Sequence, residues 1–225
     1  MKFYSIAIDG PSGAGKSSLA KRLAAELGFI YADTGAIYRT VGLAALKRGF
    51  DPENKEQILP MLPELEIKLC YNEQGEQRMY LDGEDVSGEI RLPEVSLAAS
   101  DVSAMAEVRS FLMDMQRGLA LSSSVIMDGR DIGTVVLPNA DLKIFLTASA
   151  EARAERRLKE LLEKGVDTTF EEVLSDMIAR DEQDSSRDAA PLKAAEDSVL
   201  VDTSDIGFEE SLQLLRSIVR ERLGI

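Results

Sequence analysis

The residues best suited to chemistry lie near the start of the chain, in the segment Gly10-Pro11-Ser12-Gly13-Ala14-Gly15-Lys16-Ser17-Ser18. They follow the spacing G-x-x-x-x-G-K-S, in which glycines let backbone N–H groups surround an anion without Cβ clashes. The ammonium of Lys16 would reach the β- and γ-phosphates of a nucleoside triphosphate, and the Ser17 hydroxyl would ligate Mg²⁺. The spacing therefore predicts a phosphate-binding loop (P-loop), and an ordinary flexible turn is the alternative.

The neighbouring residues provide the strand and the helix that such a loop needs. Residues 3–9 form a short apolar run rich in β-forming side chains, and Leu19, Leu23 and Leu27 then recur at helical spacing. A helix that begins at the loop would add the positive end of its dipole to the anion site. This context favours the phosphate-binding loop over the flexible turn, so we expect the chain to bind a nucleoside triphosphate.

A second charged group follows another predicted strand, residues 124–127, in the segment Asp128-Gly129-Arg130-Asp131. Ligands of open α/β sheets bind just beyond the carboxyl ends of the strands. We therefore expect Asp128 to help hold the water shell of the metal ion, and Arg130 and Asp131 to meet the substrate. A structural ion pair between Arg130 and Asp131 is the alternative.

Two predicted helices in the second half of the chain carry further arginines. In residues 150–162 the spacing i, i+3, i+4 places three of them on one helix face, as a candidate phosphate clamp: Arg153, Arg156 and Arg157. Glutamates in the same helix leave a salt-bridged, solvated helix as the alternative. The next helix is expected to begin near Thr168 and to end at Pro191. One stripe of this helix carries two cations and an anion that could face a sugar and a phosphate: Arg180, Asp184 and Arg187.

Four other polar residues are weaker candidates. Thr34 and Arg39 follow the predicted strand 29–32, where they would lie near a second phosphate-bearing ligand or on a capped surface helix. Residues 94–121 have a helical pattern whose buried stripe is expected to contain Leu97, Val102, Met105, Val108, Leu112 and Met115. Ser100 and Arg109 lie off this stripe, and spacing alone favours a solvated helix face for both.

The composition narrows the chemistry. The 225 residues contain no histidine and one cysteine, which excludes His-ligated zinc, cysteine-based metal sites, a disulfide frame and His-dependent catalytic triads. The formal net charge of −14 argues against a polymeric nucleic acid as a partner but permits a small nucleotide held by a local arginine cluster. No stretch approaches the ~18 apolar residues of a membrane span. We therefore expect no membrane partner and a cytoplasmic location.

The order of predicted elements indicates an α/β fold. Five strands, at residues 3–9, 29–32, 124–127, 142–148 and 198–203, are separated by helices, and a helix at 208–223 closes the chain. Such alternation predicts a three-layer fold with a five-stranded parallel core sheet. Residues 66–71 and 77–81 alternate in polarity on either side of a turn, which predicts a small antiparallel β insertion.

Five motifs, taken together, resemble the bacterial cytidylate kinases, which are P-loop nucleoside monophosphate kinases. They are I-D-G-P-S-G-A-G-K-S-S, D-T-G-A-I-Y-R, D-G-R-D-I-G-T-V-V, K-I-F-L-T-A-S and R-D…D-S-S-R-D-A-A-P-L. The resemblance covers almost the whole chain and implies phosphorylation of CMP and dCMP by ATP with Mg²⁺, in a monomer. It also implies one unit, residues 1–225, with a core at 1–33, 96–150 and 190–225. The monophosphate-binding region would then be 34–95, with the β insertion, and an arginine-bearing lid would be 151–189.

The resemblance also assigns expected roles to individual residues. Lys16, Arg130 and Arg180 would be catalytic. Cytosine would be contacted by Ser100, Arg109 and Asp131, and the acceptor phosphate by Thr34, Arg39 and Arg130. Arg180 and Asp184 would contact ribose and phosphate, and Arg187 the acceptor nucleotide. Relatives often have serine where this chain has Thr34, which keeps the hydroxyl. The alternatives are a P-loop kinase for another small acceptor, such as UMP, AMP or shikimate, and a nucleotide-dependent switch. A GTPase-like switch would carry N-K-x-D, which this sequence lacks.

Overall fold

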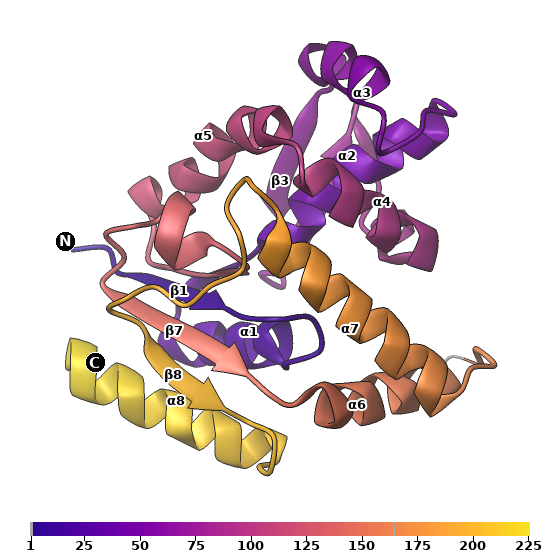
Figure 1. The fold of residues 1–225 in the computed structure, drawn as a ribbon. Helices are drawn as coiled ribbons and strands as arrows, with labels where there is room; N and C mark the ends of the chain where they lie inside the picture. The colour runs from indigo at the N-terminus through magenta and orange to yellow at the C-terminus, as the bar shows by residue number, and fades with distance from the viewer. Residues whose placement is uncertain (1, 164) are drawn as a thin grey trace.

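The computed structural model describes residues 2–163 and 165–225 and contains a five-stranded sheet with the order β2-β6-β1-β7-β8 (Figure 1). Its strands are β1 (Ser5–Asp9), β2 (Ile30–Asp33), β6 (Val125–Gly129), β7 (Leu142–Thr147) and β8 (Val199–Asp202), and all neighbours pair in parallel. The register aligns Asp9 with Gly129 and Asp33 with Asp128. The predicted five-stranded parallel sheet is confirmed, and its carboxyl edge gathers the charged segments that follow β1, β2 and β6.

Helices cover both faces of this sheet. Ile6 and Ile8 of β1 pack in one apolar cluster with α1 (Lys16–Leu27) and α8 (Phe208–Leu223). Ala7, which points to the opposite face, packs in a second cluster with Met127, and residues of α5 (Ala106–Ser122) cover that cluster. The alternation along β1 therefore produces the predicted three layers. No helix in the described part of the chain is long and apolar enough to cross a membrane.

The segment between β2 and α5 forms a region with its own apolar core. It contains α2 (Thr34–Lys47), α3 (Lys55–Met61), η1 (Leu62–Glu64), β3 (Ile67–Tyr71), β4 (Gln77–Leu81), β5 (Glu84–Asp85), η2 (Glu89–Arg91) and α4 (Pro93–Ser103). The strands form an antiparallel sheet in the order β3-β4-β5, which confirms the predicted β insertion. Side chains of α2, β4 and α4, including Val41, Met79 and Val102, share one buried cluster.

The helix α4 packs closely against α2 at Gly42. A Cβ atom at Gly42 would lie 2.9 Å from the backbone nitrogen of Ala99 and 3.1 Å from the carbonyl carbon of Ala98. The missing side chain therefore sets the distance between the two helices. The boundary that we expect at residue 95 falls within α4, and this helix packs with α2 and the β insertion, in the same apolar cluster.

The insertion is joined to the edge strand β2 through two side chains. The Gln77 amide accepts a hydrogen bond from the Asp33 backbone N–H (2.8 Å) and donates one to the Asp33 carbonyl (3.1 Å). The Tyr71 hydroxyl donates to the Tyr31 carbonyl at 2.9 Å. Side chains of β3 and β4 thus form hydrogen bonds with the backbone groups on the outer side of β2.

The helical stretch predicted at 94–121 is two helices, because α4 ends at Ser103 and α5 begins at Ala106. The Ser103 hydroxyl donates to the Ser100 carbonyl (2.8 Å), and the Arg109 guanidinium donates to the Ser103 carbonyl (3.2 Å). These side chains donate to backbone carbonyls that would accept backbone hydrogen bonds in a continuous helix. The predicted burial of Leu97 is wrong, since this side chain is 68 % exposed, whereas Val102, Met105, Val108 and Leu112 are buried.

The expected lid is a pair of packed helices, α6 (Ala150–Glu163) and α7 (Phe170–Ser186). The α7 helix begins with a capping box between Thr169 and Glu172 and runs from α6 toward α4, across the carboxyl edge of the large sheet (Figure 1). It ends at Ser186, so Arg187 lies one residue beyond the helix that we predict to continue toward Pro191. Ala154, Val173 and Met177 form the small apolar core between the two helices.

Candidate active site

The glycines of the P-loop adopt backbone conformations that other residues rarely tolerate. Gly10, Gly13 and Gly15 have φ values of 148°, 74° and 85°. A Cβ atom at Gly10 would lie 1.9 Å from the carbonyl oxygen of Leu146 in β7. The loop therefore lies directly on the neighbouring strand, and α1 starts at Lys16 with its first N–H groups at the loop.

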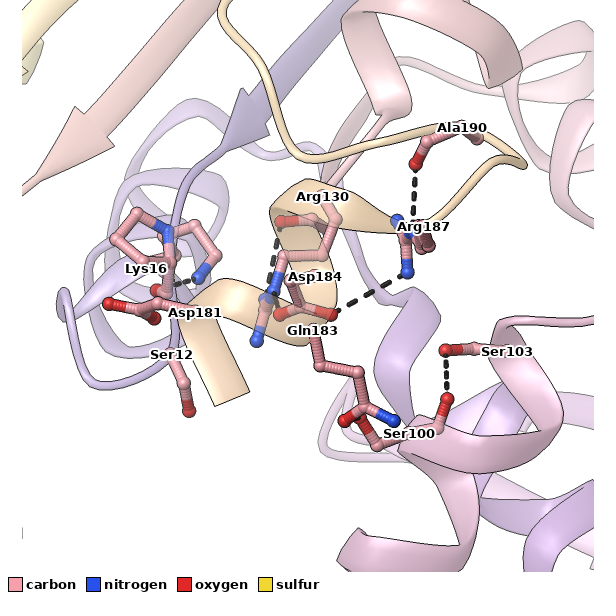
Figure 2. A network of polar contacts seen from close by, with 12 residues as sticks. Ser12, Lys16, Ser100, Ser103, Arg130, Asp181, Gln183, Asp184, Arg187 and Ala190 are labelled. Atoms are coloured by element: carbon pink, nitrogen blue, oxygen red, sulfur yellow. Dashed lines mark hydrogen bonds and ion pairs between the residues drawn. The ribbon is translucent and has the colours of Figure 1, made fainter. Parts of the chain in front are cut away.

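Lys16 is buried, and its ammonium donates a hydrogen bond to the Pro11 carbonyl at 2.7 Å (Figure 2). Burial and the nearby charge of Arg130 lower the pKa of Lys16 to about 7, against the opposing effect of Asp128 and other carboxylates. A desolvated ammonium of this kind is stabilised by any anion that enters the loop. The position of Lys16 thus agrees with the contact to the β- and γ-phosphates that we expect from the sequence.

The Ser17 hydroxyl and the Asp128 carboxylate lie side by side and are joined by a hydrogen bond. Ser17 Oγ donates to Asp128 Oδ2 at 2.7 Å, and the Tyr31 hydroxyl donates to Asp128 Oδ1 at 3.0 Å. Burial and the charge of Asp33 raise the pKa of Asp128 to about 6. Thr34 Oγ1 donates to the Asp128 carbonyl at 2.8 Å, which joins the start of α2 to the same strand end.

These oxygen atoms fit a magnesium ion that is also held by phosphate groups. Mg²⁺ prefers oxygen ligands, and in nucleotide sites one or two protein oxygens are completed by phosphates and water. Residues 2–163 and 165–225 contain no cluster of three or more His, Cys, Asp or Glu side chains that would hold a metal ion without such help. Tyr31, which orients Asp128, is a residue that sequence reasoning missed.

Asp9 is a second missed residue, and it fixes the loop that follows β6. Its carboxylate accepts hydrogen bonds from the backbone N–H groups of Ile132 (2.8 Å) and Gly133 (2.7 Å). Burial raises the pKa of Asp9 to about 6, although these two bonds oppose the shift. The signal in the sequence is a carboxylate that ends an apolar strand immediately before the P-loop.

Arg130 pairs across the fold with α7. Its Nε atom donates to Asp184 Oδ2 at 2.7 Å, and Arg187 Nη1 lies 3.6 Å from the other oxygen of Asp184 (Figure 2). Burial favours the neutral acid, but the charge and the hydrogen bond of Arg130 outweigh it and hold the pKa of Asp184 below its ordinary value. The alternative of an ion pair between Arg130 and Asp131 is therefore wrong.

Asp131 pairs instead with Arg109, and both side chains are buried. The Arg109 guanidinium also lies 5.2 Å from the centre of the Tyr38 ring, within cation–π range. The solvated helix face favoured by spacing alone is therefore wrong for Arg109, because its charge is satisfied by a partner 22 residues away in the sequence. Ser100 lies on α4, and its hydroxyl donates to Gln183 Oε1 of α7 at 2.7 Å.

Several arginine nitrogens in this region are buried and have no hydrogen-bond partner within the described residues. They are Arg39 Nε, Arg109 Nε, Arg180 Nε and Arg187 Nη2. Arg39 also pairs with Asp33 at 2.7 Å, whereas burial and the charge of Arg130 lower the pKa of Arg180 to about 10. Leaving buried cationic donors unsatisfied is costly, so these groups indicate an anionic ligand.

The three arginines of the expected phosphate clamp contact different groups. Arg153 pairs with Asp181 of α7 (2.5 Å) and donates to the Ser12 carbonyl in the P-loop (3.0 Å). Arg156 donates to the Thr203 carbonyl after β8, and Arg157 pairs with Glu160 at 3.0 Å. In this conformation the structure does not bring the three together, and their role in binding phosphate stays a prediction.

Comparison with known proteins is consistent across family, relatives and fold. The sequence model of the family described as cytidylate kinase matches residues 6–221. A cytidylate kinase of Caldicellulosiruptor bescii is 52% identical over 215 residues, which cover 95% of this chain and 94% of the relative. A cytidylate kinase of Thermosipho melanesiensis is 48% identical over 217 residues, with 96% and 97% covered.

A solved structure supports the fold alone. The crystal structure of an uncharacterised protein from Eubacterium ventriosum superposes with a TM-score of 0.54 at 14% identity, covering 98% of this chain and 100% of that one. The site described above thus lies in a fold that occurs elsewhere with very different sequences. Matched over almost its whole length by the family model, and about half identical to two relatives, the chain belongs to the cytidylate kinase family.

Proposed function

We propose that the enzyme transfers the γ-phosphoryl group of ATP to CMP and dCMP, producing ADP and the corresponding diphosphates. The proposal rests on the arginine nitrogens of α2, α5 and α7, and of the residue after α7, that are buried and have no hydrogen-bond partner within the described residues. Two phosphate-bearing ligands that meet there would satisfy these donors. Family membership and the names of the relatives support cytidine nucleotides as the acceptor.

The P-loop and Lys16 would bind the phosphates of ATP. The backbone N–H groups from Gly10 to Ser18, other than at Pro11, would donate hydrogen bonds to the β- and γ-phosphates, and the N-terminus of α1 would add the positive end of its dipole. The Lys16 ammonium would exchange its present bond to the Pro11 carbonyl for a phosphate oxygen. Because its charge is poorly solvated, this exchange is favourable.

Ser17 and Asp128 would hold magnesium as part of the same site. The Ser17 oxygen would be a direct ligand, and the Asp128 carboxylate would bind the water shell, oriented by the Tyr31 hydroxyl. When bound, Mg²⁺ neutralises charge on the β- and γ-phosphates.

The transfer itself needs positioning and charge stabilisation rather than a base. An oxygen of the CMP phosphate would attack the γ-phosphorus as the bond to the β–γ bridging oxygen breaks and ADP leaves. The attacking phosphate is already an anion, so no side chain has to remove a proton. Lys16, Arg130 and Arg180 would stabilise the charge on the equatorial oxygens. The lid would exclude water, which otherwise competes as the acceptor.

The nucleotide would lie between α4, α5 and the lid. The polar groups of Ser100, Arg109 and Asp131 would contact cytosine, and a buried polar set of this kind rejects a base that leaves it unpaired. Thr34, Arg39 and Arg130 would face the acceptor phosphate, Arg180 and Asp184 the ribose and phosphate, and Arg187 the nucleotide. Arg153, Arg156 and Arg157 complete the proposal as a clamp that forms when the lid closes.

The same proposal covers the organisation of the enzyme. Residues 34–95 would move as the monophosphate-binding region and residues 151–189 as the lid, around a core formed by 1–33, 96–150 and 190–225. We propose that the enzyme works as a monomer in the cytoplasm, where ATP and nucleoside monophosphates are available together.

An acceptor panel tests the function. Purified enzyme with ATP and Mg²⁺ is given CMP, dCMP, UMP, AMP, GMP or shikimate, and release of ADP is followed with each. Turnover confined mainly to CMP and dCMP is expected. A different preferred acceptor would refute the cytosine contacts while leaving the P-loop interpretation intact. Binding of ATP without release that depends on any acceptor would favour the nucleotide-dependent switch.

A further inference from the structure

The Gln183 side chain bridges the lid and α4 in a way that the function described so far does not use. Its Oε1 atom accepts a hydrogen bond from the Ser100 hydroxyl at 2.7 Å, and its Nε2 atom donates one to Asp101 Oδ1 at 3.4 Å. Figure 2 shows this side chain reaching from the lid toward Ser100. The bridge joins residues separated by more than 80 positions at the base end of the site.

The neighbouring carboxylate fixes the direction of these bonds. An ionised Asp101 side chain accepts hydrogen bonds and cannot donate them, so it takes the NH₂ group of the Gln183 amide. The amide oxygen is then left facing Ser100. Because that oxygen only accepts, the single hydroxyl proton of Ser100 must point to Gln183.

The consequence concerns what Ser100 offers to a nucleotide base. With its proton committed to Gln183, the hydroxyl presents only lone pairs, which accept a hydrogen bond. The 4-amino group of cytosine is a donor, whereas the 4-oxo group of uracil is an acceptor and would face the lone pairs of Ser100. We propose that Gln183, held by Asp101, is a specificity-determining residue that sets the hydrogen-bond polarity of Ser100 and so favours cytosine over uracil. This inference rests on the proposed function, in which Ser100 contacts the base.

The competing role for Gln183 is a latch that only holds the lid near α4. Such a latch would affect every acceptor equally, because it acts on closure and not on the base. The polarity mechanism predicts a change in the ratio of kcat/KM for CMP to that for UMP. This ratio therefore separates the two roles.

Three substitutions at one position give a directional test. Gln183→Met keeps a side chain of nearly the same length but removes both hydrogen bonds, which frees the Ser100 proton. The ratio of kcat/KM for CMP to that for UMP should then fall about fivefold, which corresponds to the net free energy of one hydrogen bond. Gln183→Glu keeps an acceptor for Ser100 but loses the donor to Asp101 and places a second carboxylate beside it, so the ratio should fall less than with methionine. Gln183→Lys offers only donors, which reverses the polarity of Ser100, and should lower the ratio further than methionine does.

The neighbouring exposed residue provides the matched control. Glu182→Gln changes the same turn of α7 at an exposed side chain that makes no hydrogen bond or ion pair with another described residue, and the ratio should stay at the parent value. Far-UV circular dichroism and thermal midpoints of all variants show whether each one is folded.

The outcomes are distinct. Equal losses with CMP and UMP in Gln183→Met would overturn the polarity mechanism and leave a latch. A ratio in Gln183→Lys above that of Gln183→Met would also overturn it. A parent enzyme that does not phosphorylate CMP would refute the proposed function itself, and that measurement is made first.

Discussion

The buried pair of Arg109 and Asp131 makes the stability of the enzyme sensitive to the loss of either charge. Arg109 is 5 % exposed and Asp131 is 3 % exposed, and the two side chains form an ion pair. Asp131→Asn removes the countercharge while leaving a side chain of nearly the same shape. The guanidinium is then a buried charge without a charged partner, and its Nε atom already lacks a hydrogen bond within the described residues.

The magnitude follows from the cost of breaking a buried ion pair. Removal of one partner destabilises a protein by about 3–5 kcal/mol. For a chain of this length, each kcal/mol changes the melting temperature by about 2–4 °C, so a decrease of roughly 6–20 °C is expected. The Tyr38 ring, which remains beside the guanidinium, recovers only a small part of the loss because cation–π contacts contribute about 0.5–2 kcal/mol.

The assay is urea denaturation together with differential scanning calorimetry of the unliganded enzyme. The matched control is Glu64→Gln, which breaks the surface pair between Arg48 and Glu64, whose side chains are 31% and 65% exposed. Exposed pairs of this type contribute less than about 1 kcal/mol. The double variant Arg109→Met with Asp131→Leu should regain most of the stability, because it removes the uncompensated charge, yet it should not regain the use of CMP. Equal destabilisation by Asp131→Asn and Glu64→Gln would refute the reasoning.

Four further predictions concern the P-loop, the buried carboxylate of Asp128 and helix packing. Lys16→Ala should lower turnover with ATP and CMP by at least about 10²-fold, since it removes a charge that stabilises the transferred group, and near-normal rates in a coupled assay would contradict this role. Gly10→Ala places a Cβ atom 1.9 Å from the Leu146 carbonyl oxygen, so ATP binding measured by calorimetry should be lost and retained affinity would contradict the described loop. Burial raises the pKa of Asp128 from 3.8 to about 6, so the folded state keeps a proton that the unfolded chain releases in this range. The stability that this group contributes is therefore greatest below about pH 4 and is lost as the pH rises to about 6. In urea titrations, Asp128→Asn should gain stability relative to the parent as the pH rises through this range. A stability difference that does not change with pH would argue against the raised pKa. Gly42→Ala should force α2 and α4 apart and lower the free energy of unfolding by about 1–3 kcal/mol. An unchanged KM for ATP would show that the effect is confined to packing.

Local patterns predicted the elements of this fold well because the relevant signals are short in range. The final helix was expected at residues 208–223 and occupies Phe208–Leu223, since its apolar side chains recur on one face. The strand, loop and helix around the P-loop were predicted for the same reason, and the resemblance of the motifs to cytidylate kinases was confirmed by the family match.

The contacts that complete the site were not predictable from such patterns. Arg130 pairs with Asp184 over a separation of 54 residues, and Tyr31 bonds Asp128 over 97. Neither pairing has a periodic signature, because both depend on how α7 and the edge strand β2 pack against the rest of the fold. The burial of Arg109 was missed for a related reason, since the break between α4 and α5 and the position of Asp131 decide which face of α5 is covered.

The contact between the β insertion and β2 also affects how molecules of this enzyme meet one another. β2 is an edge strand, and exposed edge strands offer free N–H and C=O groups to strands of other molecules, which promotes aggregation. Here the Gln77 amide occupies both backbone groups of Asp33, and the Tyr71 hydroxyl occupies the Tyr31 carbonyl. An incoming strand would have to displace these side chains before it could extend the sheet, so the insertion protects this edge from intermolecular β pairing.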